Sequence, residues 1–583
     1  MLIAVKIDVV LTDEMGGIMK KMRMRWIVPF AAVIFVGIIC SSSWATTYYV
    51  DFSTGNDANS GLSSATPFKR CPGDVNATSI TSSVALAAGD RVIFKGGVSY
   101  KGQININWSG SIDNPITYDG NTSGTWGLGK AIINNENDRT INNAFYGTGI
   151  RSNIVIDGFE ITNVGGYTDT ELSGLGGSLC PGGLAAAGGT GINFDSVAGS
   201  SNIRIINCYI HEMGEWHNAA YSSSKTIAGT GISLQNVKNV IIDGCEITRT
   251  HTGISLKAGN YGDRSIDTVE IKKCNIHNHL VWGLDIAPRI SGGIIRNLNI
   301  HHNKIHDYYE YDSTSWLGCG EKPHTDGIFL RTAGIASSVW TNINIYSNEF
   351  YNDWTTGGGT ASIYVSQGPS VNINNNTFVN TLHGRTIAVM YPPATGTSPQ
   401  VVRVYNNTFY NGSTAINLRD GAGTGRNVYI KNNVFYDTRV LGSNAVIYIE
   451  DSGSDPTELD SNAYFTRNTH VPPYVINRAG TLMTFNEIKT YGWEANNTTG
   501  IADPKFVDIS YGIGLNSSRN NLSLNSSSPF IDKGFPLGSY LNNDKVGIVR
   551  PYGGGWDIGA YEFTGTVTST EKKPFFPTIN PIQ

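Results

Sequence analysis

The sequence has little charge and few cysteines. Only 15% of its 583 residues are charged, the formal net charge is −5, and no Lys/Arg-rich run occurs outside the N-terminus. Binding to nucleic acid needs clustered cations, so we expect no nucleic-acid partner. None of the seven cysteines forms a CxxC pair or a His/Cys spacing that would hold structural zinc. The chain instead contains 68 glycines and 10% aromatic residues, a composition typical of strands and turns rather than helices.

The N-terminus carries a targeting signal. Residues 19–26 (MKKMRMRW) are basic, residues 27–39 (IVPFAAVIFVGII) are apolar but short for a membrane span, and residues 41–45 (SSSWA) end in a small-x-small cleavage pattern. We expect residues 1–45 to be a signal peptide, with an over-long start before Met19. The mature chain is then expected to be a secreted, periplasmic or extracellular monomer without stable membrane insertion.

An internal repeat runs through most of the chain. Nine segments align on the pattern N-[IV]-x-I-x-x-[CN]-x-[IF], some with a substitution at one or two positions, and they start at positions 153, 202, 239, 268, 297, 342, 370, 401 and 427. Units of the form G-I-x-[LFI] and its variants lie between them, and the usual repeat spacing is 26 to 31 residues. Alternating apolar runs separated by Asn and Gly turns indicate short strands with one buried face. This repeat, without helical periodicity, predicts an all-β solenoid, a parallel β-helix whose coils stack at ~4.8 Å.

The seventh repeat position predicts a ladder of side chains along the helix axis. It is occupied by Phe159, Cys208, Cys245, Cys274, Asn303, Asn348, Asn376, Asn407 and Asn433. Stacked asparagine amides can bond one another across coils, and buried cysteines act as small apolar residues. Only Cys71, Cys180 and Cys319 then remain for one disulfide bond in an oxidising compartment.

These features resemble a known group of proteins. The G-I-x-L strand, the N-[IV]-x-I strand, the Asn turn and the short strand after it are similar to the right-handed parallel β-helix of pectate lyases and related polysaccharide-active enzymes. YYVDFSTGNDANSGLSSATPFK and AAGDRVIFKGGVSY resemble the opening cap of secreted bacterial β-helix proteins, whereas IADPKFVD, SSSPFIDKG and GGGWDIGAYEF resemble their closing region. The resemblance implies a polysaccharide substrate, with a cap over 46–90, a β-helix over 91–465, a closing region over 466–563 and a flexible tail over 564–583.

The loop lengths predict where a substrate groove forms. The loops 248–252 and 277–282 are short, whereas 162–190, 211–230 and 306–326 are long. Two low coils between high walls make a groove, and its floor is the outward face of the G-I-x-L strand. Alternation along this strand turns five side chains outward, namely Ser255, Lys257, Asp285, Phe329 and Arg331. The resembling enzymes bind substrate at the same strand and loops.

The candidate catalytic residues are the ionisable side chains of this strand and its loop ends: Lys257, Asp285, Asp326, Arg331, His251 and His324. A lyase removes the C5 proton of a uronate, which is poorly acidic until an arginine or calcium neutralises the neighbouring carboxylate. Arg331 could bind that carboxylate, and Lys257 could act as base if burial lowers its pKa. Calcium could be held by Asp285, Glu321 and Asp326. The alternative for Lys257 and Arg331 is an ordinary solvated strand face.

A glycoside hydrolase is the second hypothesis. Such an enzyme needs two carboxylates, ~5 Å apart for retention or ~6.5 to 9.5 Å apart for inversion, and Asp285 and Asp326 lie on consecutive coils. The motif HTDGI (324–328) is similar to the NTDG motif of polygalacturonases. The Asp-Asp pair and the Gly-His-Gly and Arg-Ile-Lys motifs that follow in those enzymes are missing here, so membership of that family is not expected.

The long loop 306–326 adds a carbohydrate-binding hypothesis, because aromatic side chains stack on sugar rings. The candidate substrate-binding residues are Trp316, Tyr309, Tyr311 and Phe329. A non-catalytic, adhesive or glycan-binding solenoid and a polymer epimerase remain open beside the lyase, which we favour. Three histidines, His211, His277 and His306, share one register, and an exposed polar ladder is favoured over a metal site.

Overall fold

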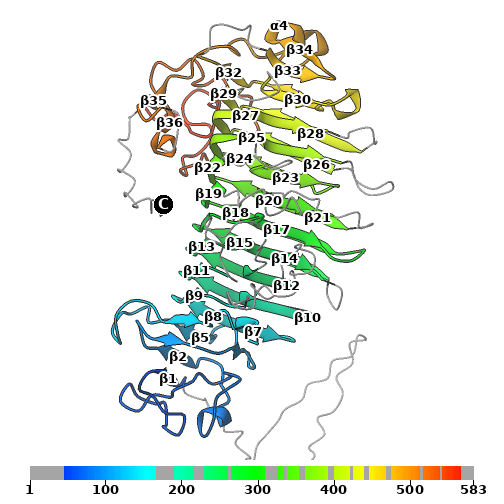
Figure 1. The fold of residues 1–583 in the computed structure, drawn as a ribbon. Helices are drawn as coiled ribbons and strands as arrows, with labels where there is room; N and C mark the ends of the chain where they lie inside the picture. Colours follow the sequence, from blue (N-terminus) through cyan, green and yellow to red (C-terminus); the bar gives the residue numbers. More distant parts are fainter. Residues whose placement is uncertain are drawn as a thin grey trace, which may run out of the picture. The chain divides into compact units, whose positions relative to one another are not determined.

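The computed structural model describes residues 45–565 with thirteen gaps, at residues 139, 166–188, 214–228, 260–263, 309–324, 333–337, 354–360, 392–399, 420–424, 439–444, 468–473, 513–515 and 539–540. The described chain forms coils of parallel strands, and equivalent strands of successive coils pair to give three sheets (Figure 1). Within these residues no helix is long and apolar enough to cross a membrane.

The first sheet contains the N-[IV]-x-I strands, whose apolar residues alternate between core and surface. In order of pairing its strands are β1 (Thr47–Val50), β2 (Arg91–Phe94), β5 (Ile116–Asp119), β8 (Ser152–Asp157), β10 (Thr190–Ile206), β12 (Thr230–Asp243), β15 (Ser265–Lys272), β18 (Ile294–His301), β21 (Val339–Tyr346), β24 (Val371–Asn374), β26 (Gln400–Tyr405), β28 (Arg426–Lys431) and β31 (Glu458–Asp460). Only the second halves of β10 and β12 belong here, because both strands continue through a corner from the third sheet.

The second sheet contains the short strands that follow the Asn turn. They are β3 (Ser99–Tyr100), β6 (Ile132–Asn134), β9 (Glu160–Thr162), β11 (Tyr209–His211), β13 (Glu246–Thr248), β16 (Asn275–His277), β19 (Lys304–Tyr308), β22 (Glu349–Asp353), β25 (Thr377–Met390), β27 (Thr408–Leu418), β29 (Val434–Thr438) and β32 (Ala463–Phe465). The strands β25 and β27 contribute their first halves to this sheet and their second halves to the third.

The third sheet contains the G-I-x-L strands. Besides parts of β10, β12, β25 and β27, it consists of β4 (Ile104–Asn105), β7 (Asn143–Thr148), β14 (Thr252–Ala258), β17 (Trp282–Pro288), β20 (Asp326–Arg331), β23 (Ile363–Ser366), β30 (Ile447–Ile449) and β33 (Tyr474–Arg478). All these pairings are parallel. The predicted parallel β-helix is therefore confirmed.

Irregular elements lie between and after the coils. They are η1 (Thr81–Ser83), η3 (Ser452–Ser454), the strand β34 (Thr481–Thr484), α4 (Phe485–Ile488), η4 (Lys489–Tyr491) and η5 (Ser517–Arg519). The strand β34 pairs antiparallel with β33, and α4 begins with a capping box between Thr484 and Glu487. The buried Phe485 and Trp493 belong to the main core, so this segment packs on the C-terminal coils.

The ladder of the seventh repeat position is present. Each asparagine from Asn303 to Asn433 donates an Nδ2–H to the Oδ1 of the next ladder residue at 2.9–3.0 Å. The ladder continues for one rung beyond the predicted set, to Asn462. There it ends on the buried carboxylate of Glu494, which accepts the Nδ2–H of Asn462 at 2.7 Å. Bonds of this kind satisfy amides that would otherwise be buried without partners.

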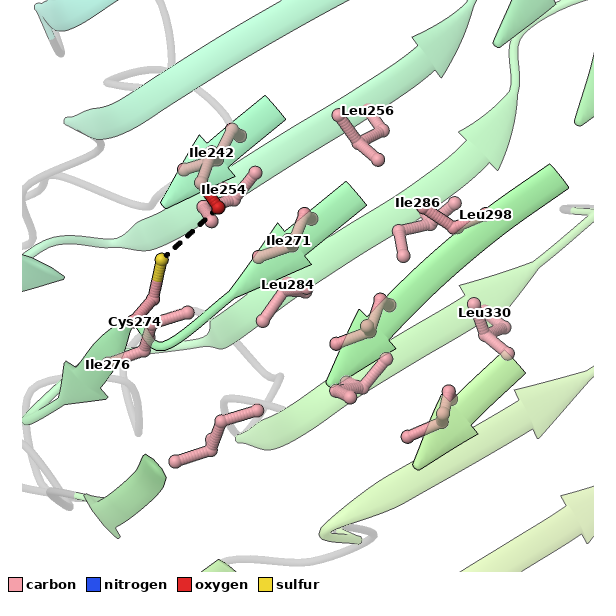
Figure 2. Packing of buried hydrophobic residues seen from close by; sticks show 14 of the residues in the cluster. Ile242, Ile254, Leu256, Ile271, Cys274, Ile276, Leu284, Ile286, Leu298 and Leu330 are labelled. Atoms are coloured by element: carbon pink, nitrogen blue, oxygen red, sulfur yellow. Dashed lines mark hydrogen bonds between the residues drawn. The ribbon is translucent and has the colours of Figure 1, made fainter. Parts of the chain in front are cut away.

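The cysteine part of the ladder is apolar packing. Cys208, Cys245 and Cys274 are free, buried thiols, and Cys274 donates its S–H to the carbonyl of Ile242 at 3.8 Å (Figure 2). Figure 2 shows that the neighbouring side chains are rows of isoleucine and leucine from successive coils. Cys71 is also free and buried, while Cys180 and Cys319 lie outside the described residues.

The described residues of the segment 502–563 pack along the outer face of the second sheet. Val379, Tyr410 and Tyr436 of that sheet share a core with Phe506 of β35 (Phe506–Asp508), and β36 (Asn521–Leu524) pairs antiparallel with β35. Lys545 reaches back to the carbonyls of Ser347 and Asn348, at 3.2 and 3.1 Å. This packing covers the second sheet in the C-terminal coils. The predicted site residues lie on a different sheet, the third.

Candidate active site

The outer face of the third sheet presents side chains in rows along the helix axis. Ile254 and Leu256 are fully buried in the core, so the alternating residues Ser255 and Lys257 lie on the other face of β14. Ser255 pairs with Asp285, which pairs in turn with Phe329. This confirms the outward alternation expected for the G-I-x-L strand.

Lys257 and Arg331 belong to a second row, beside the first. Lys257 pairs with Ala287 of β17, and Ile286 pairs with Leu330, which places Arg331 opposite Ala287. The two cations are thus two coils apart, or ~10 Å along the axis. The small side chain of Ala287 leaves room between them for a group from the neighbouring row.

That group is the carboxylate of Asp285. It forms an ion pair with the Nζ of Lys257, and it accepts hydrogen bonds from the Nε and Nη2 of Arg331 at 3.2 and 3.1 Å. Only 5% of the side chain of Lys257 and 5% of that of Asp285 are exposed, against 28% for Arg331. The solvated strand face that was the alternative for Lys257 does not describe this arrangement, because the lysine is buried.

Burial and the mutual charges set the protonation of this cluster. Burial lowers the pKa of Lys257 to about 8, a shift that Asp285 opposes and Arg331 reinforces. Burial alone would raise the pKa of Asp285, but the charges of Lys257 and Arg331 bring it below its usual value. Asp285 is therefore ionised at neutral pH, while Lys257 exchanges its proton in the mildly alkaline range.

Aromatic rings surround the guanidinium of Arg331. Its Cζ lies 4.9 Å from the ring centre of Trp282 and 5.1 Å from that of Phe329, and such cation–π contacts orient the group. His251 meets Trp282 edge-on, with ring centres 5.8 Å apart. Burial lowers the pKa of His251 to about 4, so this histidine is neutral at neutral pH. Trp282 escaped the sequence analysis, although its place at the start of a G-I-x-L strand was a signal.

Asp326 lies apart from the Lys257–Asp285–Arg331 cluster. In the register of β17 and β20, Asp326 pairs with Trp282, whereas Asp285 pairs with Phe329, three residues further along β20. The Cα atoms of Asp285 and Asp326 are therefore ~11 Å apart. Its Oδ1 accepts the backbone N–H of Ala361 at 2.9 Å, and the residue is fully buried. This arrangement gives Asp326 a role in holding the next coil. Its predicted role in hydrolysis stays a prediction.

The predicted histidine register has a structural explanation. His277 and His306 stack with ring centres 4.9 Å apart, and each hydrogen-bonds to the preceding coil, His277 to Glu246 at 3.2 Å and His306 to Asn275 at 2.8 Å. His211 likewise contacts Glu160 at 3.3 Å. In the described part of the chain no group of three or more His, Cys, Asp or Glu side chains is arranged to hold a metal ion.

Several predicted residues lie outside the described residues. They are Trp316, Tyr309, Tyr311, His324 and Glu321, all in the long loop before β20. The floor of the predicted groove is therefore described, whereas most of its wall is not. Sequence reasoning also missed Tyr364, whose ring meets that of Phe329 edge-on with centres 5.0 Å apart.

Comparisons with known proteins find similarity among solved structures only. A scan of protein-family models finds no match, and a search of curated proteins finds none. Solved structures that resemble the chain include the pectate lyase Pel9A (14% identity, 90% of this chain and 98% of that chain covered, TM-score 0.44). Another is a GH136 lacto-N-biosidase from Eubacterium ramulus (15% identity, 74% of this chain and 68% of that chain covered, TM-score 0.47). A third is a rhamnogalacturonan lyase (14% identity, 80% of this chain and 92% of that chain covered, TM-score 0.41). All three TM-scores are below 0.5, so no property of these proteins is transferred to this chain.

Proposed function

We propose that the protein is an exported polysaccharide lyase that cleaves a uronic-acid-containing polymer by β-elimination at the Lys257–Asp285–Arg331 cluster. The observation that carries this proposal is the environment of Lys257. A lysine can act as a base near neutral pH only if its pKa falls well below the usual value, and burial on this face has that effect. An ordinary solvated lysine would stay protonated.

The elimination follows from the positions of the two cations. The neutral Nζ of Lys257 takes the C5 proton, the C5–H electron pair forms the C4=C5 double bond, and the C4–O glycosidic bond breaks. The leaving oxygen takes a proton from water. The products are one chain with a new reducing end and one that begins with an unsaturated uronate.

Arg331 stabilises the charge that develops during proton removal. The guanidinium of Arg331 donates its Nε–H and one Nη2–H to Asp285. Three of its five N–H donors therefore remain for a substrate carboxylate. Trp282 and Phe329 hold the guanidinium plane, which keeps these donors in one orientation. A bound carboxylate that is neutralised in this way makes the neighbouring C5 proton more acidic.

Calcium is the alternative group for neutralising the substrate carboxylate. The described carboxylates fit this ion poorly, because the Asp285 carboxylate is bound by two cations and Asp326 accepts a backbone amide. Arg331 therefore neutralises the substrate carboxylate, and no step depends on calcium.

The test is an ultraviolet assay for the conjugated unsaturated uronate on a panel of uronic-acid polymers, with added calcium and with a chelator. We expect absorbance to rise with at least one polymer, and Lys257→Met to abolish the rise. Lys304→Met, a lysine of β19 on the second sheet, is the matched control and should keep full activity. Reducing ends without absorbance would indicate a hydrolase, and binding without either product a non-catalytic protein. Either result contradicts the proposal.

A further inference from the structure

Arg385 is a half-buried cation of the third sheet that forms no ion pair with a carboxylate among the described residues. It lies on β25, after the point where that strand leaves the second sheet. Two other arginines of this face are paired, Arg331 with Asp285 at 3.1 Å and Arg419 with Glu450 at 2.8 Å. An arginine that loses hydration without gaining a counter-charge pays a free-energy cost, which an anionic ligand would offset.

The side chain of Arg385 reaches the row of the proposed catalytic cations. Its Nη1 lies 3.7 Å from the Sδ of Met390. Met390 pairs with Ser366, which pairs with Arg331, so Met390 stands two coils beyond Arg331 in the same row. The strands β20, β23 and β25 that carry these residues follow one another in Figure 1. The guanidinium of Arg385 therefore lies ~10 Å from Arg331 along the axis, toward the C-terminal coils.

Tyrosine rings lie near this cation. Tyr364 and Tyr391 both lie within electrostatic range of Arg385; Tyr364 is buried against the sheet, whereas 44% of Tyr391 is exposed. Burial lowers the pKa of Arg385, and the nearby charge of Arg419 lowers it further. The charge of Asp326 raises the pKa of Arg385, but the described residues show no ion pair between these two side chains. Aromatic rings beside a cation are suited to an acidic sugar.

We propose that Arg385, with the exposed Tyr391 beside it, binds the carboxylate of a uronic-acid residue that lies beyond the cleavage site, toward the C-terminal coils of the β-helix. This inference rests on the proposed function and deepens it, because it requires two acidic sugars in one substrate, one at Arg331 and one at Arg385. On the N-terminal side the same face carries neutral or acidic groups, such as Asn193 and the hydrogen-bonded pair Asp195 and Gln235. The third sheet therefore favours an acidic sugar on the side toward its C-terminal coils, and not on the side toward its N-terminal coils.

Binding is measured by calorimetry in the Lys257→Met background, so that the ligand is not consumed. The ligands are oligogalacturonate, oligoalginate, and neutral and sulfated oligosaccharides of matched length. We expect Arg385→Gln to weaken binding of the best oligouronate about tenfold. The variant should change the Kd of neutral ligands by less than about twofold. For the oligouronate it should reduce the dependence of log Kd on the logarithm of the salt concentration. Arg403→Gln on β26 of the first sheet is the matched control and should change neither ligand.

The outcomes separate this inference from the lyase proposal. If elimination is observed in the parent but Arg385→Gln binds the oligouronate as tightly as before, or loses neutral and acidic ligands equally, the inference is wrong and the lyase stands. Arg385-dependent binding without elimination in the parent supports the anionic site and refutes the lyase. Tighter, Arg385-dependent binding of the sulfated ligand would overturn the uronate assignment. Should Arg385→Gln not fold, Arg385→Lys should weaken only the acidic ligand, by about threefold.

Discussion

Lys257 and Arg331 stand two coils apart in one row, and both bind the carboxylate of Asp285 on the coil between them. The carboxylate keeps two cations close together on a largely buried sheet face. It also opposes the effect of burial on Lys257, because its negative charge favours the protonated amine. The geometry of this cluster therefore determines both its stability and the pH at which a base becomes available.

The first prediction concerns the pH dependence of cleavage. A base acts only when deprotonated, so kcat/KM should rise with pH and level off above about pH 8, the pKa of Lys257. Asp285→Asn removes the charge that favours protonation, so the rise should move to lower pH. The measurement is the initial rate of unsaturated-product formation between pH 5 and 10. A rise that stays at the same pH in Asp285→Asn would contradict this assignment of the base.

The second prediction concerns the stability of the cluster. Asp285→Ala leaves the charges of Lys257 and Arg331 buried without a partner, and should lower the free energy of unfolding by about 3 kcal/mol. The double variant Lys257→Met/Asp285→Ala should recover part of this loss, since it removes one of the stranded charges. Urea unfolding followed by circular dichroism measures both effects. Asp195→Ala, on the same face but exposed, is the control and should change stability by less than about 0.5 kcal/mol.

Much of the fold was predictable because the repeat is periodic. A residue such as Asn376 recurs at the same position in each coil, so its ladder bonds follow from sequence spacing alone, and the rows of Lys257 and Arg331 follow from strand alternation. The additional rung at Asn462 escaped the analysis because its segment, ELDSNAYF, lacks the N-[IV]-x-I start of the repeat.

The site was less predictable than the fold, because side-chain partners across coils depend on conformation. Strand register places Asp285 beside the row of Lys257 and Arg331, yet the sequence could not show that the fork of Arg331 would bind Asp285 and leave three donors for substrate. Asp326 had the position of a site residue, but its carboxylate accepts the backbone amide of Ala361 on the next coil. Arg385 was missed because it precedes its repeat unit, outside the pattern.

The third prediction tests the asparagine ladder. Asn376→Ala removes the acceptor of Asn348 and the donor to the Oδ1 of Asn407 and to the carbonyl of Ile345, all of them buried. Unsatisfied buried groups on both neighbouring coils should cost about 2–4 kcal/mol in unfolding free energy. Asn372→Ala breaks a bond to Asn344 on the outer face of the first sheet and should cost less than about 1 kcal/mol. Equal losses in the two variants would show that the ladder has no special weight.

The fourth prediction concerns pH and the end of this ladder. Glu494 accepts bonds from Asn462, Asn497 and Tyr464, yet burial raises its pKa from the usual 4.5 to about 7. The folded chain therefore binds a proton that the unfolded chain releases above pH 4.5. The associated stability is complete below about pH 4.5 and is lost as pH rises through about 7, by up to about 3 kcal/mol. Glu494→Gln stays neutral, so its unfolding free energy relative to the parent should rise between pH 5 and 8. A constant difference between the two proteins over that range would show that Glu494 is already ionised in the folded chain.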